Sequence, residues 1–238
     1  MCFLYVLVGY PSWGQEKAAT AHVRIEKGMA PKTEKSTAAT SDASGVVAWL
    51  VPLDRSTAGN PPEKSASRLQ IVQKNKSFQP HLTVTRVGSV VDFPNHDPYF
   101  HNVFSLFDGK RFDLGLYEAG ATNSVRFDHA GISFLFCNIH PEMSAVIVAV
   151  DTPYYAVSTK SGSLTVPGVP NGEYELHVWY ERSLPEKLKN LARRVQLSDQ
   201  SRDLGTIVVP EDSNLSPAHK NKYGQDYPPP PKQPYSNP

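Results

Sequence analysis

The most chemically distinctive stretch of the sequence runs from Phe134 to Met143. An apolar, strand-like run ends at Cys137, and a short loop places His140 three residues later and Met143 three residues beyond that. A thiolate and an imidazole are strong ligands for a soft metal, and a thioether is a weak axial ligand. This donor set suits a metal ion that gains and loses one electron.

A trigonal site of this kind needs a second imidazole, which the loop does not contain. His101 offers one, because it lies within a second apolar, strand-like run from Tyr99 to Ser105. His96 is the main rival, but it lies in a proline-flanked loop rather than in a strand. The predicted ligands of a single copper ion are therefore His101, Cys137, His140 and Met143.

The ordinary alternative for these residues is packing in a core. A lone cysteine usually behaves as a small buried hydrophobic residue, and a lone histidine in a strand is usually structural. His140 and Met143, at regular spacing after Cys137, favour the ligand interpretation.

The loop also resembles a known family. Its Cys-x-x-His-x-x-Met spacing is similar to the copper loop of the cupredoxins, and the proline after His140 makes it most similar to amicyanin. His101-Asn102-Val103 resembles the His-Asn-Val of plastocyanin-type strands, in which the histidine is the first copper ligand. The stretch from Val91 to Met143 resembles bacterial plastocyanin-like proteins labelled as methylamine-utilisation proteins.

The resemblance covers residues 68–151 and implies a Greek-key β-sandwich with one type 1 (blue) copper ion. It implies that Asn102 braces the ligand loop against the neighbouring strand. It also implies that Ile139 and Pro141 form an apolar rim around His140, where a redox partner docks. Simple packing of the loop explains Ile139 and Pro141 equally well.

Composition sets wider limits. The chain has 238 residues, 39% of them hydrophobic, and a formal net charge of +1. That length suits one large or two small domains. Charges of both signs are interspersed without a basic block, which argues against a nucleic-acid partner. Short apolar runs between turns, with 21 prolines, predict an all-β fold.

A second β-sandwich is predicted downstream of the copper stretch. Residues 163–166 and 173–179 resemble two strands of the carboxypeptidase-regulatory-like (transthyretin-like) sandwich. The matching residues are Gly162, Leu164, Pro170, Gly172, Tyr174, Leu176 and Val178. The first strands of that sandwich are absent after residue 151, but the upstream segments 21–25 and 45–51 could supply them. We therefore expect the copper domain to be inserted in, or joined to, this second sandwich.

The expected organisation has six parts. These are a leader or signal-like segment (1–20), the first strands of the regulatory-like sandwich (21–55), a linker (56–67), the copper domain (68–151), the rest of the sandwich (152–210) and a disordered proline-rich tail (211–238). A helix of a turn or two is expected after Ser183.

The N-terminal run from Met1 to Val8 is too short to span a bilayer. It resembles the apolar core of a signal peptide without the basic start, and this favours a truncated export signal and a periplasmic or secreted protein. A buried N-terminal strand is the alternative. A disulfide between Cys2 and Cys137 would consume the strongest ligand, so we expect Cys137 to be free.

Four functional classes follow from these patterns. The first is a non-catalytic electron carrier whose partner is a redox protein such as a c-type cytochrome or a dehydrogenase. A copper enzyme would need further paired histidines, and the sequence has no His-x-His pair. Copper delivery usually needs Met-rich or His-rich tracts, and there are only three methionines. The fourth class is an adhesion or wall-binding β module with a degenerate metal site. The sequence predicts no transmembrane helix, and it leaves the oligomeric state open.

Overall fold

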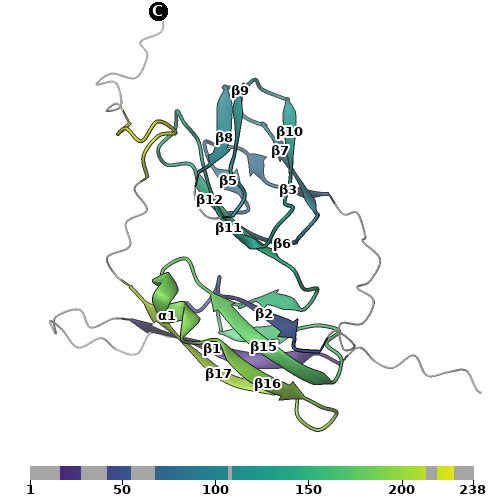
Figure 1. The fold of residues 1–238 in the computed structure, drawn as a ribbon. Coiled ribbons are helices and arrows are strands. Elements are labelled where there is room, and N and C mark those ends of the chain that lie inside the picture. Colours follow the sequence, from purple (N-terminus) through teal and green to yellow (C-terminus); the bar gives the residue numbers. More distant parts are fainter. Residues whose placement is uncertain (1–16, 28–41, 55–67, 107–108, 213–218, 228–238) are drawn as a thin grey trace, which may run out of the picture.

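The computed structural model describes residues 17–27, 42–54, 68–106, 109–212 and 219–227 (Figure 1). These residues contain seventeen strands and one short helix, α1 (Pro185–Lys189). The predicted all-β fold class is confirmed, and α1 is the short helix that was expected after Ser183. The expected leader up to residue 16, the linker 56–67 and the proline run near the C-terminus lie outside the described residues.

Ten strands between residues 69 and 150 form the unit that carries the predicted metal ligands (Figure 1). They are β3 (Leu69–Gln70), β4 (Val72–Gln73), β5 (Phe78–Gln79), β6 (Leu82–Arg86), β7 (Val90–Pro94), β8 (His101–Ser105), β9 (Phe112–Tyr117), β10 (Thr122–Arg126), β11 (Gly131–Phe136) and β12 (Ser144–Val150). One sheet has the order β6-β12-β11-β8-β9, a second has the order β10-β7-β3, and β4 pairs with β5.

This unit has its own apolar core. Fourteen buried side chains form it, including those of Phe93, Phe127 and Ile147, and two of the predicted ligands, Cys137 and Met143, belong to the same cluster. The metal loop is therefore anchored in the core at both of its ends.

Seven strands form a second unit. One sheet has the order β14 (Ser163–Val166), β1 (Ala19–Lys27), β17 (Asp203–Glu211), and the other has the order β13 (Tyr155–Val157), β2 (Val47–Pro52), β15 (Gly172–Trp179), β16 (Arg193–Leu197). Buried and exposed residues alternate along the first seven residues of β1, which is the pattern of a strand with one face on a core.

Strands from before and after residues 69–150 share both sheets of the second unit. β1 pairs antiparallel with β14 and parallel with β17, and β2 pairs antiparallel with β13 and β15. The chain also returns close to where it left, because the Thr152 hydroxyl donates a hydrogen bond of 2.8 Å to the Leu50 carbonyl. The path between these two residues passes through β3–β12.

The two units meet at an apolar contact. Val146, Val148 and Val150 of β12 form a separate buried cluster with Val47 of β2. The rings of Phe134 and Trp179 meet edge to face at 6.5 Å in the same region. β12 is therefore covered on both faces, which accounts for its continuous run of apolar residues.

Sequence analysis missed two strands and misjudged part of the tail. β5 has only two residues, and β9 is interrupted by Asp113 and Gly115, so neither shows a clear apolar period. A disordered tail was predicted from residue 211 onward, but the described residues there are ordered. Glu211 ends β17, and residues 219–227 contact the metal loop. Aromatic and hydrogen-bonding side chains, rather than an apolar period, hold that segment.

We predict that the second unit does not fold from residues 152–238 alone, because that fragment lacks β1 and β2. Residues 68–151 expressed alone should fold. As a control, a chain with residues 55–151 replaced by a short Gly-Ser linker should also fold. Circular dichroism and limited proteolysis of the three proteins check this, and a stable 152–238 fragment would contradict the inserted arrangement.

A second prediction concerns an ion pair between the two units. His81 Nε2 lies 2.7 Å from Glu181 Oε2, and the hydrogen bond to Glu181 raises the pKa of His81 although burial opposes this. The stabilisation is therefore fully present below about pH 6.5 and is lost as pH rises through the raised pKa. Because both side chains are partly exposed, we expect at most about 1 kcal/mol.

Thermal unfolding midpoints measured between pH 5 and 9 check this. His81→Gln, Glu181→Gln and the double variant should show the same flattened pH profile, because each removes the same pair. A profile that stays steep in the double variant would assign the dependence to other groups.

Candidate metal centre

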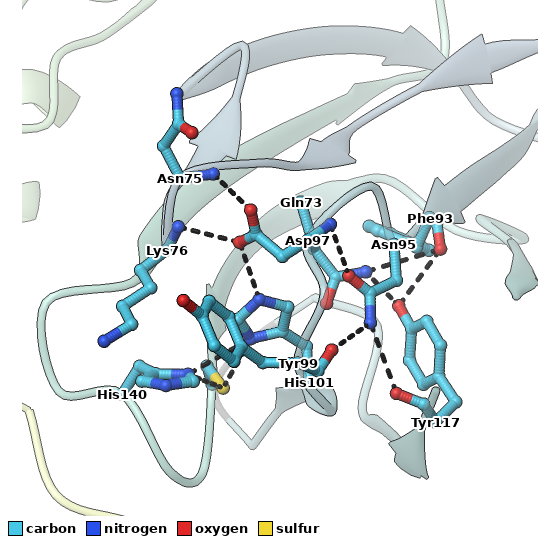
Figure 2. A network of polar contacts seen from close by, with 11 residues as sticks. Gln73, Asn75, Lys76, Phe93, Asn95, Asp97, Tyr99, His101, Tyr117 and His140 are labelled. Atoms are coloured by element: carbon cyan, nitrogen blue, oxygen red, sulfur yellow. Dashed lines mark hydrogen bonds and ion pairs between the residues drawn. The ribbon is translucent and has the colours of Figure 1, made fainter. Parts of the chain in front are cut away.

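Three of the four predicted ligands come together, and Figure 2 shows the two histidines facing each other. The ligand atoms of His101, Cys137 and His140 all lie within 4.8 Å of one another. His101 Nδ1 is 3.1 Å from His140 Nδ1, and Cys137 Sγ is 3.9 Å from the first nitrogen and 3.7 Å from the second. The two imidazoles and the thiol therefore face a common point.

Strand pairing brings these residues together. His101 is the first residue of β8, and Cys137 directly follows β11. β8 and β11 run antiparallel as neighbours, with Phe104 opposite Phe136. Two distant parts of the sequence thus deliver a histidine and a cysteine to the same end of the sheet.

The loop after Cys137 is closed by its own backbone. The Met143 N–H donates to the His140 carbonyl at 3.1 Å, and the Cys137 N–H donates to the Met143 carbonyl at 3.3 Å. β12 then begins at Ser144, opposite Phe136 of β11. His140 is therefore held by a tight turn between two paired strands.

The donors differ in exposure. His101, Cys137 and Met143 are fully buried, whereas His140 is partly exposed. His140 is thus the donor closest to solvent. Met143 lies in the same core cluster as Cys137, and its axial role stays a prediction.

Asp97 fixes the orientation of the buried imidazole. The His101 Nε2–H donates to Asp97 Oδ2 at 2.8 Å, because an ionised carboxylate can only accept. This leaves the Nδ1 lone pair of His101 facing the thiol. Carboxylates commonly orient metal-binding histidines in this way. Sequence analysis did not identify Asp97 as a partner of His101, although its position four residues before His101 was a usable signal.

A tight turn at residues 75–76 holds Asp97 in place. The backbone N–H groups of Asn75 and Lys76 donate to its two oxygens at 2.6 and 2.8 Å (Figure 2). Both residues have left-handed backbone, with φ of 56° and 51°, and this points the two N–H groups the same way. Burial would raise the pKa of Asp97, but these two N–H groups and His101 outweigh it and lower the pKa.

Buried amide and phenol groups support the loop before His101. Asn95 accepts from the Asp97 N–H at 3.0 Å and donates to the Tyr99 carbonyl at 2.7 Å. Tyr117 donates to the Phe93 carbonyl at 3.0 Å and also contacts the Gln73 amide. Sequence analysis did not identify this network, because its members are scattered along the chain.

Neither Asn102 nor His96 belongs to the donor cluster. The Asn102 side chain does not brace the ligand loop: its amide donates to Asp113 and to the Gly115 carbonyl, both in β9. For the side chain that expectation was wrong, because β9, which sequence analysis missed, is the neighbour of β8 on that side; the Asn102 backbone N–H instead faces the Cys137 sulfur. The rival ligand His96 is exposed and does not belong to the donor cluster.

The surroundings set the protonation of the donors. Burial raises the pKa of the Cys137 thiol, although the backbone N–H groups of Ile139, Asn102 and His140 oppose this. Burial, together with the charge of His101, lowers the pKa of His140. The metal-free site therefore favours a neutral thiol and a neutral imidazole, and a metal ion that binds has to displace the thiol proton.

The geometry fits one metal ion. In zinc sites the metal lies about 2.0–2.1 Å from an imidazole nitrogen and about 2.3 Å from a thiolate. Donors on one ion are therefore less than about 4.4 Å apart, and the three measured separations meet this limit. One thiolate with two imidazoles is the in-plane donor set that blue copper prefers.

No family model matches the chain, and no curated protein does. Among solved structures, it is similar to a copper-containing nitrite reductase from Thermus scotoductus SA-01, with 23% identity over 42% of this chain and 27% of that one, at a TM-score of 0.34. A purple cupredoxin from Nitrosopumilus maritimus shows 22% identity over 34% of this chain and 98% of that one, at a TM-score of 0.31.

Amicyanin from Paracoccus versutus shows 18% identity over 42% of this chain and 90% of that one, at a TM-score of 0.32. The chain thus spans about a quarter of the nitrite reductase and most of the two smaller proteins. TM-scores this low carry no argument about function, so the assignment below is based on the site itself.

We predict that Asp97→Asn weakens copper binding about 10- to 100-fold, the usual cost of losing a partner of a metal-binding histidine. The amide also lowers the donor strength of His101, so the reduction potential should rise. Equilibrium competition with a chelator and voltammetry measure both effects. Asp128→Asn, an exposed carboxylate paired with Lys110, is the control and should change neither value. Unchanged affinity in Asp97→Asn would show that His101 does not depend on the carboxylate.

Proposed function

We propose that this protein is a type 1 copper protein of the cupredoxin kind that carries single electrons between redox partners. The observation that carries the proposal is the buried cluster of one thiol and two imidazoles, with its donor atoms within 4.8 Å. Copper bound by this donor set would supply a couple that gains and loses one electron.

The protein's part is to hold the donors still. The paired strands β8 and β11 fix His101 and Cys137, the turn up to Met143 fixes His140, and Asp97 sets the ring orientation of His101. The buried side of the site excludes water. A frame that cannot rearrange suits electron transfer, because both oxidation states must accept the same geometry.

The partly exposed His140 marks the side where a partner can approach. Ile139 beside it is 42% exposed, and Pro141 is also exposed. An apolar rim around a ligand edge suits a brief encounter with another redox protein, such as a c-type cytochrome or a dehydrogenase. The role proposed here is that of a carrier rather than an enzyme.

Organisation and location complete the proposal. The strand pairings of β1 and β2 support a copper domain inserted into a second, transthyretin-like sandwich. An oxidisable copper thiolate and the signal-like N-terminal sequence support a place in the bacterial envelope, periplasmic or secreted. No helix in the described part of the chain is long and apolar enough to cross a membrane.

The other functional classes make different predictions for the copper-loaded protein. A carrier shows an intense thiolate-to-copper absorption band. A copper-delivery protein takes up copper but shows only weak ligand-field bands. An adhesion module with a degenerate site takes up no copper. One visible spectrum of the purified protein with added Cu(II) therefore separates them.

We predict that Cys137→Ser abolishes the intense band while the protein stays folded. A hydroxyl cannot replace the soft, covalent thiolate donor, whereas the core consists mainly of strand residues. Absorption and circular dichroism check this, and Cys2→Ser is the matched control that should keep the band. Survival of the band in Cys137→Ser would remove that residue from the site.

We predict that Met143→Leu still binds copper, with a raised reduction potential. A thioether donates weakly to Cu(II), so its loss disfavours the oxidised state, and leucine conserves the buried volume. Voltammetry measures the shift. A lowered potential would count against an axial role for Met143.

A further inference from the structure

A C-terminal segment lies against the metal loop. The described residues 219–227 (yellow in Figure 1) are far from the loop in sequence. Three of their groups nevertheless contact the loop: one contacts Phe136, one contacts Asn138, and one contacts the carbonyl of Cys137 itself. None of the roles assigned above to the ligands requires this segment.

Two hydrogen bonds join the segment to the metal loop, one at the Cys137 carbonyl and one at the Asn138 side chain. The Tyr227 hydroxyl donates to the Cys137 carbonyl at 2.7 Å. The Lys222 N–H donates to Asn138 Oδ1 at 3.0 Å. Burial, with the charge of Cys137, raises the pKa of Tyr227 to about 12, so its hydroxyl keeps its proton at physiological pH.

Ring contacts add to these bonds. The His219 ring stacks on Phe136, the residue before Cys137, with ring centroids 3.9 Å apart. Tyr227 meets His219 edge to face at 5.3 Å, and its hydroxyl lies 3.3 Å from His219 Nδ1. One connected group of side chains thus covers the strand end that presents the thiol.

The segment is also tied to the neighbouring strand and to itself. Lys222 Nζ lies 2.7 Å from Asp113 Oδ2 of β9, and Asn102, next to His101, donates to the other oxygen of the same carboxylate. Within the segment, Asn221 Oδ1 accepts from the N–H groups of Tyr223 and Gln225, each at 3.0 Å. The segment is thus a folded turn that bridges the loop and β9.

We propose that residues 219–227 form a strap that positions the metal loop on its Cys137 side, and that Tyr227 is its main positioning residue. The strap keeps the Cys137–Asn138 peptide in place, shields the thiol from solvent and slows loss of the bound metal. The effect on the metal rests on the copper site proposed above, whereas the effect on the thiol does not.

The size of the effect follows from the lost bond. A hydrogen bond of this type is worth roughly 1 kcal/mol, or about fivefold in an equilibrium. If the thiol is reached only when the strap lifts, Tyr227→Phe should raise its reactivity by about that factor. The phenyl ring keeps the contact with His219, so the change isolates the hydroxyl.

The test compares Tyr227→Phe with Tyr223→Phe, both in a Cys2→Ser background so that Cys137 is the sole thiol. Tyr223 lies on the same turn but is 70% exposed, and its side chain interacts with Lys222 rather than with the metal loop. We expect N-ethylmaleimide to alkylate the metal-free Tyr227→Phe protein about fivefold faster than its parent, and Tyr223→Phe to match the parent. A Cu(I) chelator should remove copper faster from Tyr227→Phe alone.

Equal alkylation rates in the parent and in Tyr227→Phe would overturn the strap. Faster alkylation of Tyr227→Phe in a protein that takes up no copper would support the strap and refute the copper proposal. A blue protein whose alkylation and copper-loss rates are both unaffected by Tyr227→Phe would support the copper proposal and refute the strap.

Discussion

The constraint on which this structure depends is that two imidazoles and a thiol meet in an apolar interior. Buried polar groups need partners, and here the two buried donors, His101 and Cys137, each have protein partners as well as a side turned toward the site. Asp97 holds the outer nitrogen of His101, and backbone N–H groups face the Cys137 sulfur. A site that is already oriented in this way need not reorganise when a metal ion arrives.

The second unit supports this arrangement through its contact with β12. β12 follows the metal loop directly, and its outer valines are buried against Val47 of the second unit. An exposed β12 would have to carry polar residues on its outer face, with less apolar area to hold it in register. Covering both faces fixes the strand that closes the loop, so the second unit contributes to the site without touching it.

Sequence alone indicated the parts of the site that are local. Cys137 and His140 follow one another within a single loop, and the strand around His101 has a clear apolar pattern, so spacing and residue type were sufficient to predict that these three residues lie together. Asp97 was not identified, because an aspartate in a proline-flanked loop has the same sequence signature whether it forms a turn or orients an imidazole. What gives Asp97 its orienting role is the left-handed turn at residues 75–76, whose N–H groups hold the carboxylate. The pairing of β4 with β5 creates this turn.

The same reasoning explains the failures at β9 and in the tail. Asp113 and Gly115 break the period of β9, yet they receive the side chain of Asn102, so the break is itself a contact site. In residues 219–227, single aromatic and amide groups make the contacts with the metal loop. Such isolated contacts leave no periodic pattern in the sequence. Contacts of this kind depend on which parts of the chain, distant in sequence, come close in the fold. Composition does not reveal this.

These elements together make the centre asymmetric. The C-terminal segment covers the Cys137 side and the second unit covers the outer face of β12, whereas His140 stays partly exposed beside Ile139. A metal held here would be shielded where the thiolate is vulnerable to oxidation and reachable where an imidazole edge meets solvent. Since electron transfer weakens with distance, a redox partner of the proposed carrier would gain most by approaching the exposed edge of His140.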